Sequence, residues 1–352
     1  MAKQIKGIMV VHPERGMYKA GEVDWVGHYT RWVALLNSHK QITMDFAGLS
    51  DKTDFSFLSK YDFVFLYVLP VNKPTGCEYW WYDVPTVVAP YCRKLILQFD
   101  YEGIMPTLPP FIKATINNNV DALGYNSPLA EKWNINIPKY NLTMLQPVEE
   151  LEKLVTPQPL DNIEPQSGIG VLWHSGTGCS IDLSLRICSR LPYVTKVFTS
   201  WVGMGKEFLE QHVAQFFPTK QPEVYGQKVG ERVVCYPFMG YELFLHFLGK
   251  CSVFLEDNVG YYGVSRVAYE CASLGVPVVG STNSTVCNLA YPFTTTNPQN
   301  AQLQTQLIKR LMSDQPFYDR VANYAYNAMK DYTSNENRLT QFVEMLQDLK
   351  VL

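Results

Sequence analysis

The sequence predicts an α/β protein made of two doubly wound domains. Short apolar runs typical of buried strands alternate with segments whose apolar residues recur at helical spacing. Such alternation is typical of parallel strands joined by crossover helices. The pattern breaks between Gln146 and Gln166, where Pro, Glu and Asn are frequent, and a second strand–helix series begins at Gly168. At 352 residues the chain also exceeds one comfortable hydrophobic core, which favours two domains.

In the first half of the chain, apolar runs predict strands over residues 7–12, 42–46, 63–69, 94–99 and 120–125. A helix is expected after the first strand, because one stripe of apolar residues is formed by Val26, Tyr29, Val33 and Leu36. Ser127-Pro128 is expected to begin another helix, since serine caps helix N-termini and proline suits the first helical position.

In the second half, strands are expected over residues 169–173, 195–200, 232–236, 252–256 and 276–280. Helices are expected after Ser180, from Tyr241 to a stop at Gly249, and over most of the chain after Gln299. Another helix is predicted by a buried face formed by Val264, Val267, Ala268, Cys271 and Leu274. We therefore expect an N-terminal domain over residues 1–150, a linker over 151–167, a C-terminal domain over 168–320 and C-terminal helices over 321–352.

Composition excludes some functions and favours one compartment. The formal net charge of −3 gives no global attraction to nucleic acid, although a local basic groove stays open. The 8 cysteines lack metal-type spacing and sit mostly in apolar runs, which suits reduced thiols. The first residues lead directly into an apolar strand, and the longest apolar run, Phe63 to Pro70, is too short to span a bilayer. We expect a cytoplasmic protein without a membrane span, in the host cytoplasm if the source is viral.

The segment from Glu256 to Gly280 is the most informative part of the chain. A strand end leads into a glycine-rich loop and then a helix, so the backbone at Gly263, Val264 and Ser265 can approach a bound anion beside the positive end of the helix dipole. Arg266 and Glu270 lie one turn apart on a face other than the buried one. A cation followed by a carboxylate suits a nucleotide sugar, with diphosphate at the first and ribose at the second. An ordinary surface ion pair is the alternative.

A second loop of this kind, His174 to Ser180, follows the first strand of the C-terminal domain. Its residues Ser175, Gly176 and Thr177 supply the hydroxyls and the close backbone approach that a phosphate needs. A tight connection built of turn residues is the alternative. Two such loops at the same end of one sheet are better evidence than either alone.

The pattern formed by Asp257, Gly260, Gly263, Glu270 and Gly275-Val-Pro-Val-Val resembles the donor-site signature of GT-B glycosyltransferases, closest to the retaining family four. The resemblance implies two Rossmann-like domains facing across a cleft, with the last helix crossing back to the first domain. It implies that Glu270 binds the donor ribose and that Gly263, Val264 and Ser265 meet the diphosphate.

Four further residues are compared with the same family pattern. Tyr236 and Phe238 leave a strand where the family places the nucleotide base, with core packing as the alternative. Tyr262 stands where the family carries a second glutamate, so the contact to the donor sugar is expected to differ. Arg266 also departs from the aliphatic residue usual in that turn.

In the first domain, Asp100 follows a predicted strand at its carboxyl end and is our candidate general base for an acceptor hydroxyl. Family-four enzymes commonly place His-Asp here, and Phe99 replaces that histidine. Inverting phage DNA base glucosyltransferases, which carry a catalytic aspartate after the equivalent strand, also resemble this chain. A cap role for Asp100 is the alternative, with Glu102 as its substitute. Gly27 and His28 stand where the family has a glycine pair that touches donor phosphate and acceptor, and His28 is a second acid–base candidate.

Several motifs are missing from the sequence. It contains no Asp-x-Asp, Walker A or His-Glu-x-x-His motif, which lowers the expectation of a metal–diphosphate clamp, an ATPase or a zinc peptidase. We therefore expect a glycosyltransferase that uses a nucleoside-diphosphate sugar, UDP first among them, with no metal and no other cofactor.

The acceptor is left open between a hydroxymethylated DNA base and a glycan or small molecule. A non-catalytic nucleotide-sugar-binding module and a nucleotide-sugar epimerase are the alternative functions. The stereochemistry of transfer and the oligomeric state are also left open.

Overall fold

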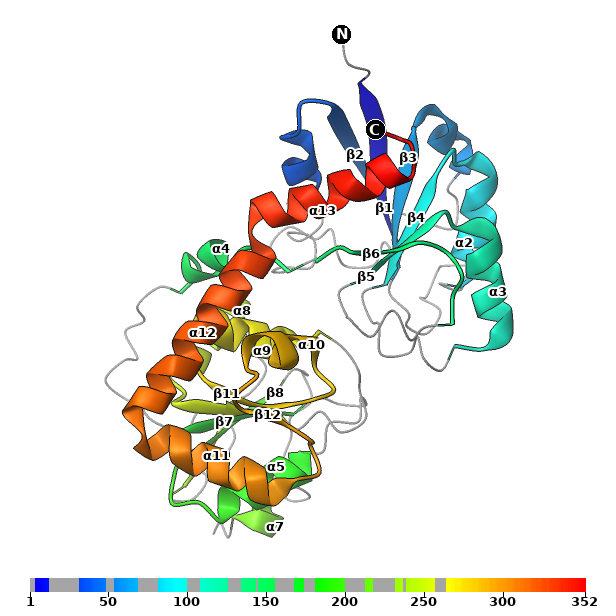
Figure 1. Ribbon diagram of the computed structural model, residues 1–352. Coiled ribbons are helices and arrows are strands. Elements are labelled where there is room, and N and C mark those ends of the chain that lie inside the picture. The colour runs from blue at the N-terminus through cyan, green and yellow to red at the C-terminus, as the bar shows by residue number, and fades with distance from the viewer. Residues whose placement is uncertain are drawn as a thin grey trace. The chain divides into compact units, whose positions relative to one another are not determined.

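The computed structural model describes residues 4–12, 32–48, 54–68, 82–99, 108–125, 134–143, 145–155, 168–173, 181–199, 213–217, 232–236, 239–256 and 264–352. It divides into two compact units (Figure 1). One unit joins Met1–Gln146 to Tyr332–Leu352, and the other is Pro147–Asp331. The division falls within helix α12 (Gln315–Thr333), so the last stretch of the chain belongs to the N-terminal unit.

The N-terminal unit is built on a parallel six-stranded sheet with the order β2-β1-β3-β4-β5-β6. Its strands are β1 (Ile5–His12), β2 (Ile42–Gly48), β3 (Phe63–Val68), β4 (Leu95–Phe99), β5 (Ala122–Tyr125) and β6 (Lys139–Asn141). The chain builds outwards first on one side of β1 and then on the other, which is the doubly wound arrangement. Strand β5 starts later than expected because the Asp121 carboxylate accepts hydrogen bonds from Lys94 and from the Leu95 amide, at 2.7 and 2.8 Å.

Helices cover both faces of this sheet because its strands are apolar on both sides. One face packs against helices α2 (Val84–Val88) and α3 (Pro110–Asn119) and the 3₁₀ segments η1 (Phe55–Lys60) and η2 (Ala89–Tyr91). The other face packs against the helical residues 32–37 and α13 (Asn335–Asp348). Phe342 of α13 is fully buried and places its ring centroid 5.5 Å from that of Phe65 and 5.7 Å from that of Trp32.

The second unit has its own parallel six-stranded sheet, in the order β12-β11-β10-β7-β8-β9. Its strands are β7 (Ile169–Trp173), β8 (Thr195–Thr199), β9 (Val233–Tyr236), β10 (Val253–Leu255), β11 (Val278–Ser281) and β12 (Thr295–Thr296). Its helices are α4 (Val148–Glu152), α5 (Ile181–Ser189), α7 (Ala214–Phe216), α8 (Tyr241–Gly249), α9 (Arg266–Ser273), α10 (Thr285–Ala290), α11 (Ala301–Ser313) and α12.

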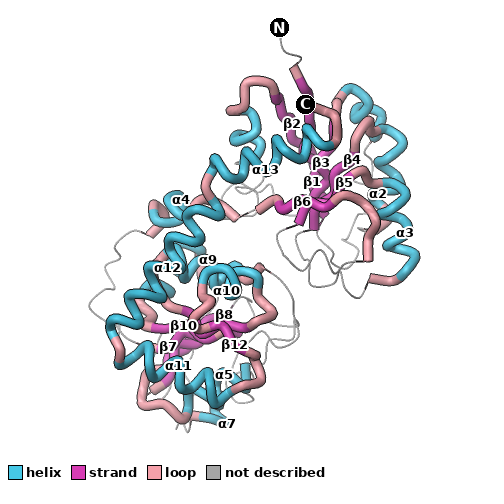
Figure 2. Tube along the Cα trace, viewed as in Figure 1, coloured by secondary structure: helices cyan, strands magenta, loops and turns pink. Residues whose placement is uncertain are grey.

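Helices also lie on both sides of this second sheet, with α9 and α10 on one side and α5 and α11 on the other (Figure 2). Strand β11 begins later than expected, since the Val276 amide donates to the Cys271 carbonyl at 2.9 Å and closes the end of α9 instead. The helix expected from Ser127 lies outside the described residues. Both units are doubly wound α/β units, so the prediction of two Rossmann-like domains is confirmed, while the cleft between them stays a prediction.

Candidate functional site

The site predicted in the second unit lies at the carboxyl ends of β7 and β10. These strands are parallel neighbours, with Val171 opposite Leu255, and they flank the point where the strand order reverses. Ligands of open α/β sheets bind at such a switch point, beyond the carboxyl ends of the strands. The two glycine-rich segments therefore follow adjacent strands at the carboxyl end of the same sheet. Most of their predicted site residues lie outside the described residues: Ser175, Gly176, Thr177, Tyr262 and Gly263.

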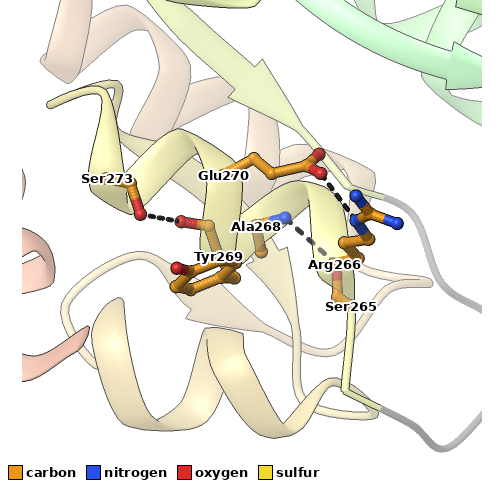
Figure 3. A network of polar contacts seen from close by, with 6 residues as sticks. All are labelled: Ser265, Arg266, Ala268, Tyr269, Glu270 and Ser273. Atoms are coloured by element: carbon orange, nitrogen blue, oxygen red, sulfur yellow. Dashed lines mark hydrogen bonds and ion pairs between the residues drawn. The ribbon is translucent and has the colours of Figure 1, made fainter. Parts of the chain in front are cut away.

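Helix α9 begins with an unusual turn at Ser265. This residue has φ 49° and ψ 87°, in the left-handed region that a residue with a side chain rarely adopts. Its hydroxyl oxygen accepts a hydrogen bond from the Ala268 amide at 3.3 Å and so caps the helix (Figure 3). The capped helix places Arg266 in its first turn and Glu270 in its second. Within α9, the Tyr269 amide donates to the Ser265 carbonyl at 3.3 Å. The amides before Tyr269 belong to the first turn, where an α-helix offers no carbonyl of its own to accept from them.

Arg266 and Glu270 form an ion pair across one turn of α9. The Arg266 Nε donates to the Glu270 Oε1 at 2.9 Å (Figure 3). The Glu270 side chain is only 2% exposed, whereas that of Arg266 is 31% exposed. The i,i+4 ion pair of the alternative is therefore present, but its carboxylate is buried and not at the surface. The expectation that Glu270 lies on a face apart from the buried one is corrected too, because α4, α8 and α10 all contact α9 and leave it little solvent face.

Tyr241 contacts the Arg266–Glu270 pair, and sequence reasoning did not single it out for this. It is the first residue of α8, and the Arg266 guanidinium lies over its ring, 4.6 Å from the centroid. Burial raises the pKa of the Tyr241 phenol, and the nearby Glu270 carboxylate raises it further. The hydroxyl is buried without a hydrogen-bond partner among the described residues. In the sequence Tyr241 is one more apolar position on a helical stripe, and no local pattern links it to Arg266.

Glu256 is the second residue that sequence reasoning did not single out. It follows β10 directly, and its Oε2 accepts a hydrogen bond from the Cys287 thiol at 2.6 Å. The pKa of the Glu256 carboxyl is raised by burial, while hydrogen bonds from Cys287 and Ser265 lower it by less. The carboxyl group is thus joined to the capping turn of α9 on one side and to α10 on the other.

Tyr236, predicted at the nucleotide base, ends β9 and belongs to the core. Its ring stacks on that of Phe198, with centroids 4.9 Å apart and planes at 11°, and it lies 5.0 Å from the Phe247 ring. The residue is 3% exposed. A stacking role for the Tyr236 ring is therefore corrected to core packing, because neighbouring rings already cover it. Phe238 lies outside the described residues.

The acid–base candidates of the first unit fall in segments that come after β1 and β4 in the chain. The last residue of β4, Phe99, is buried, and β4 pairs with β3 and β5 on either side. Four predicted residues lie outside the described residues: Gly27, His28, Asp100 and Glu102. Elsewhere in the described part of this unit, the rings of Tyr82 and Phe111 meet edge to face, with centroids 5.9 Å apart.

Metal-binding clusters and membrane-spanning helices are both absent from the described part of the chain. No group of three or more His, Cys, Asp or Glu side chains that could hold a metal ion occurs there. No described helix is long and apolar enough to cross a membrane.

Comparison with known proteins links the fold to one architecture. The sequence matches no protein-family model and no curated protein. Among solved structures, it is similar to sucrose-phosphate synthase from Thermosynechococcus elongatus, with a TM-score of 0.70, 13% identity and coverage of 98% of this chain and 99% of that chain. Anabaena HepE in complex with UDP gives a TM-score of 0.68 at 11% identity, covering 98% and 100%. An α-glucosyltransferase in complex with UDP-glucose and DNA containing an abasic site gives 0.62 at 12%, also covering 98% and 100%. The fold is therefore that of the GT-B glycosyltransferases.

Proposed function

We propose that this protein is a glycosyltransferase that moves a sugar from a nucleoside-diphosphate sugar to an acceptor hydroxyl. The observation that carries the proposal is the buried Glu270 carboxylate, held by Arg266 in the first turns of α9 beside the switch point of the second sheet. Structures of the same fold are complexes with UDP or UDP-glucose, which supports a uridine nucleotide as the donor. The donor-site signature in the same segment supports the same assignment.

In the proposed donor complex, Glu270 accepts hydrogen bonds from the ribose hydroxyls. A carboxylate has about four lone-pair positions, and the hydrogen bond from the Arg266 Nε occupies one of them. Arg266 donates its Nε–H to Glu270, and we assign the charge of the same guanidinium to the diphosphate. A guanidinium suits this double role because its planar fork of five donors can serve two anions at once.

The diphosphate would lie between the two glycine-rich loops. We assign to it the backbone of Gly263, Val264 and Ser265, together with Ser175, Gly176 and Thr177 of the other loop. The positive end of the α9 dipole favours an anion at this place. We assign the base to the end of β9, through the main chain of Tyr236 and through Phe238, and the donor sugar to the region of Tyr262.

The proposed reaction needs one proton acceptor in the first unit. Asp100 would take the proton from the acceptor hydroxyl, with His28 or Glu102 as the substitute and Gly27 beside the reacting groups. The acceptor oxygen forms a bond to the anomeric carbon, and the bond from that carbon to the diphosphate oxygen breaks with its electron pair. Arg266 and the amides at the start of α9 would stabilise the departing diphosphate, where negative charge grows.

We propose that this chemistry needs no bound metal and no further cofactor. The sequence lacks the Asp-x-Asp motif of a metal–diphosphate clamp, and Arg266 supplies a positive charge in the same segment. We also propose a reducing, cytoplasmic compartment, because Cys235, Cys271 and Cys287 are buried thiols and burial raises the pKa of each.

The acceptor divides the proposal into two versions. A hydroxymethylated DNA base is supported by the similarity to a glucosyltransferase whose complex contains DNA, and the net charge of −3 counts mildly against it. A glycan or small-molecule acceptor is supported by the similarity to sucrose-phosphate synthase.

Calorimetry with UDP-glucose, GDP-glucose and ADP-glucose, followed by mass spectrometry of hydroxymethylated DNA, free sugars and sugar phosphates, tests the proposal. Binding of one nucleotide sugar together with a mass increase of one sugar on one acceptor is the expected result. Binding without transfer or donor hydrolysis would instead favour a non-catalytic binding module, and isomerisation of the donor sugar would favour an epimerase. A protein that binds none of the three donors would contradict all these versions.

A further inference from the structure

Glu256 occupies a position that two strands fix. Its amide donates to the Val279 carbonyl of β11 at 3.0 Å, and Leu255 before it pairs with β7 and β11. The sheet therefore holds Glu256 at the carboxyl end of β10, beside the switch point and directly before the glycine-rich loop. A carboxyl group at this place needs an explanation, because a carboxylate next to a bound diphosphate would repel it.

Cys287 fixes the carboxyl group from the side of α10. The Cys287 amide donates to the Ser284 hydroxyl oxygen at 3.1 Å, so the cap of α10 sets the position of the thiol. The thiol lies against Gly280 of β11, where a side chain would bring its Cβ within 2.7 Å of the Cys287 Cβ. Since no side chain fits at residue 280, the strand leaves room for Cys287 and for the hydrogen bond to Glu256.

Ser265 connects this pair to the proposed phosphate site. A residue in the left-handed region keeps that shape only when its surroundings enforce it. The Ser265 hydroxyl oxygen accepts from the Ala268 amide at 3.3 Å, and a hydrogen bond between the Ser265 and Glu256 side chains lowers the pKa of the carboxyl group. Both bonds involve the serine hydroxyl, so they fix the rotation of its side chain and the turn that carries it.

Burial shifts Glu256 toward the neutral acid, which would weaken its repulsion of a diphosphate. Burial is the largest cause acting on the pKa of Glu256 and raises it above its ordinary value of 4.5, which favours the neutral acid. The thiols of Cys271 and Cys287 and the phenol of Tyr291 interact with the charge of Glu256, and α9 also carries the paired Arg266 and Glu270. Burial raises the pKa of both thiols and of the phenol, so these three stay neutral as well.

We propose that Glu256, anchored by Cys287, is a positioning residue that holds the Ser265 turn in the shape that receives the diphosphate of the donor. This inference rests on the proposed function. It assigns to Glu256 no contact with the reacting atoms; the residue acts through the backbone of Ser265 and the start of α9.

The test is calorimetric titration of the full-length protein with UDP-glucose, whose diphosphate does not titrate near neutral pH. Glu256→Ala should weaken binding at least tenfold, while Glu256→Gln, which keeps a neutral hydrogen-bonding group of the same size, should stay within about threefold of wild type. Cys287→Ala should weaken binding and Cys287→Ser should restore it. Cys235→Ala removes another buried thiol of the same unit and serves as the matched control, with unchanged affinity expected.

The outcomes separate this inference from the proposed function. Thermal unfolding identifies any variant that fails to fold, and the Gln and Ser variants then provide the comparison. If wild type binds UDP-glucose and Glu256→Ala binds equally well, the positioning role is overturned while the donor site stands. If Glu256→Gln loses as much affinity for UDP-glucose as Glu256→Ala does, the argument that Glu256 acts as a neutral acid is overturned. If wild type binds none of the three nucleotide sugars, the proposed function fails and the positioning role fails with it.

Discussion

Glu270 is buried while its partner Arg266 reaches solvent, and the two are joined across one turn of α9 by a 2.9 Å contact between Oε1 and Nε. The asymmetry matters because an uncompensated charge is more costly inside a protein than at its surface. Arg266 also covers the ring of Tyr241, so the guanidinium connects α8 to α9 as well as neutralising the carboxylate.

We expect Arg266→Met to destabilise the second unit more than Glu270→Gln does. Removing the arginine leaves a carboxylate at 2% exposure without this cation, which should cost about 3 kcal/mol of unfolding free energy. Removing the glutamate leaves a partly exposed arginine that water can solvate. Urea denaturation followed by circular dichroism measures both values. Equal losses in the two variants would mean that the burial of Glu270 does not set the energetics of the pair.

Glu270→Ala should abolish binding of UDP-glucose. The carboxylate is the group we assign to the ribose hydroxyls, and alanine offers no acceptor in its place. Calorimetry at matched protein concentrations provides the measurement, and Glu336→Ala in the first turn of α13 is a suitable control, because it also removes a helical glutamate. Retained affinity in Glu270→Ala would move the ribose site elsewhere.

Asp100→Asn should leave donor binding intact and remove turnover. The amide has nearly the same size as the carboxylate and cannot accept the acceptor's proton as a general base. Donor binding is measured by calorimetry and transfer by mass spectrometry of the product. A variant that transfers sugar at the wild-type rate would exclude Asp100 as the base and direct attention to His28 or Glu102.

Tyr241→Phe should leave the unfolding free energy of the ligand-free protein unchanged or raise it by up to about 1 kcal/mol, because it removes a buried hydroxyl that lacks a partner among the described residues. Tyr241→Leu should instead lower the unfolding free energy by about 1 to 2 kcal/mol, since it removes the ring under the Arg266 guanidinium. The melting temperatures of Tyr241→Phe and Tyr241→Leu, each compared with that of wild type, test both expectations. Loss of stability in the phenylalanine variant would show that the hydroxyl forms a hydrogen bond worth keeping.

The pH dependence of stability should report on Glu256. Its pKa in the folded protein is raised above 4.5 by burial, so the folded state binds the proton more tightly than the unfolded state does. The stability that Glu256 gains from binding its proton more tightly in the folded state is present in full below about pH 4.5, and it is lost as the pH rises through the folded-state pKa. Glu256→Gln should therefore gain stability relative to wild type as the pH increases from 4.5 to 8, measured as the difference between urea midpoints. A difference independent of pH would show that the carboxyl group titrates normally.

The elements that sequence could predict are those whose pattern lies within one segment. The apolar runs of β3 and β4 gave their strands almost to the residue, and the four-residue spacing gave the pairing of Arg266 with Glu270. The short edge strands β6 and β12 were missed, because two or three residues carry too little alternation to mark a strand.

Burial and long-range contacts explain the remaining differences. The apolar stripe of α9 reports only one face of one helix, so it does not reveal that α4, α8 and α10 all contact this helix. The bond between Glu256 and Cys287 joins residues 31 positions apart, and the contact of Tyr241 with Arg266 joins two helices. No local spacing encodes either contact. Tyr236 was expected at the base because it ends a strand, but aromatic neighbours from β8 and α8 draw its ring into the core.

The fully buried Phe342 has a consequence for synthesis on the ribosome. Its ring lies among those of Trp32, Phe63 and Phe65. The strands of the N-terminal unit are made before α13, so that side of their sheet is covered only after α13 has been made. The unit formed by Pro147–Asp331 is continuous and can mature earlier. Until α13 has been made, this side of the N-terminal sheet lacks its cover, and transiently exposed apolar surface of this kind favours aggregation.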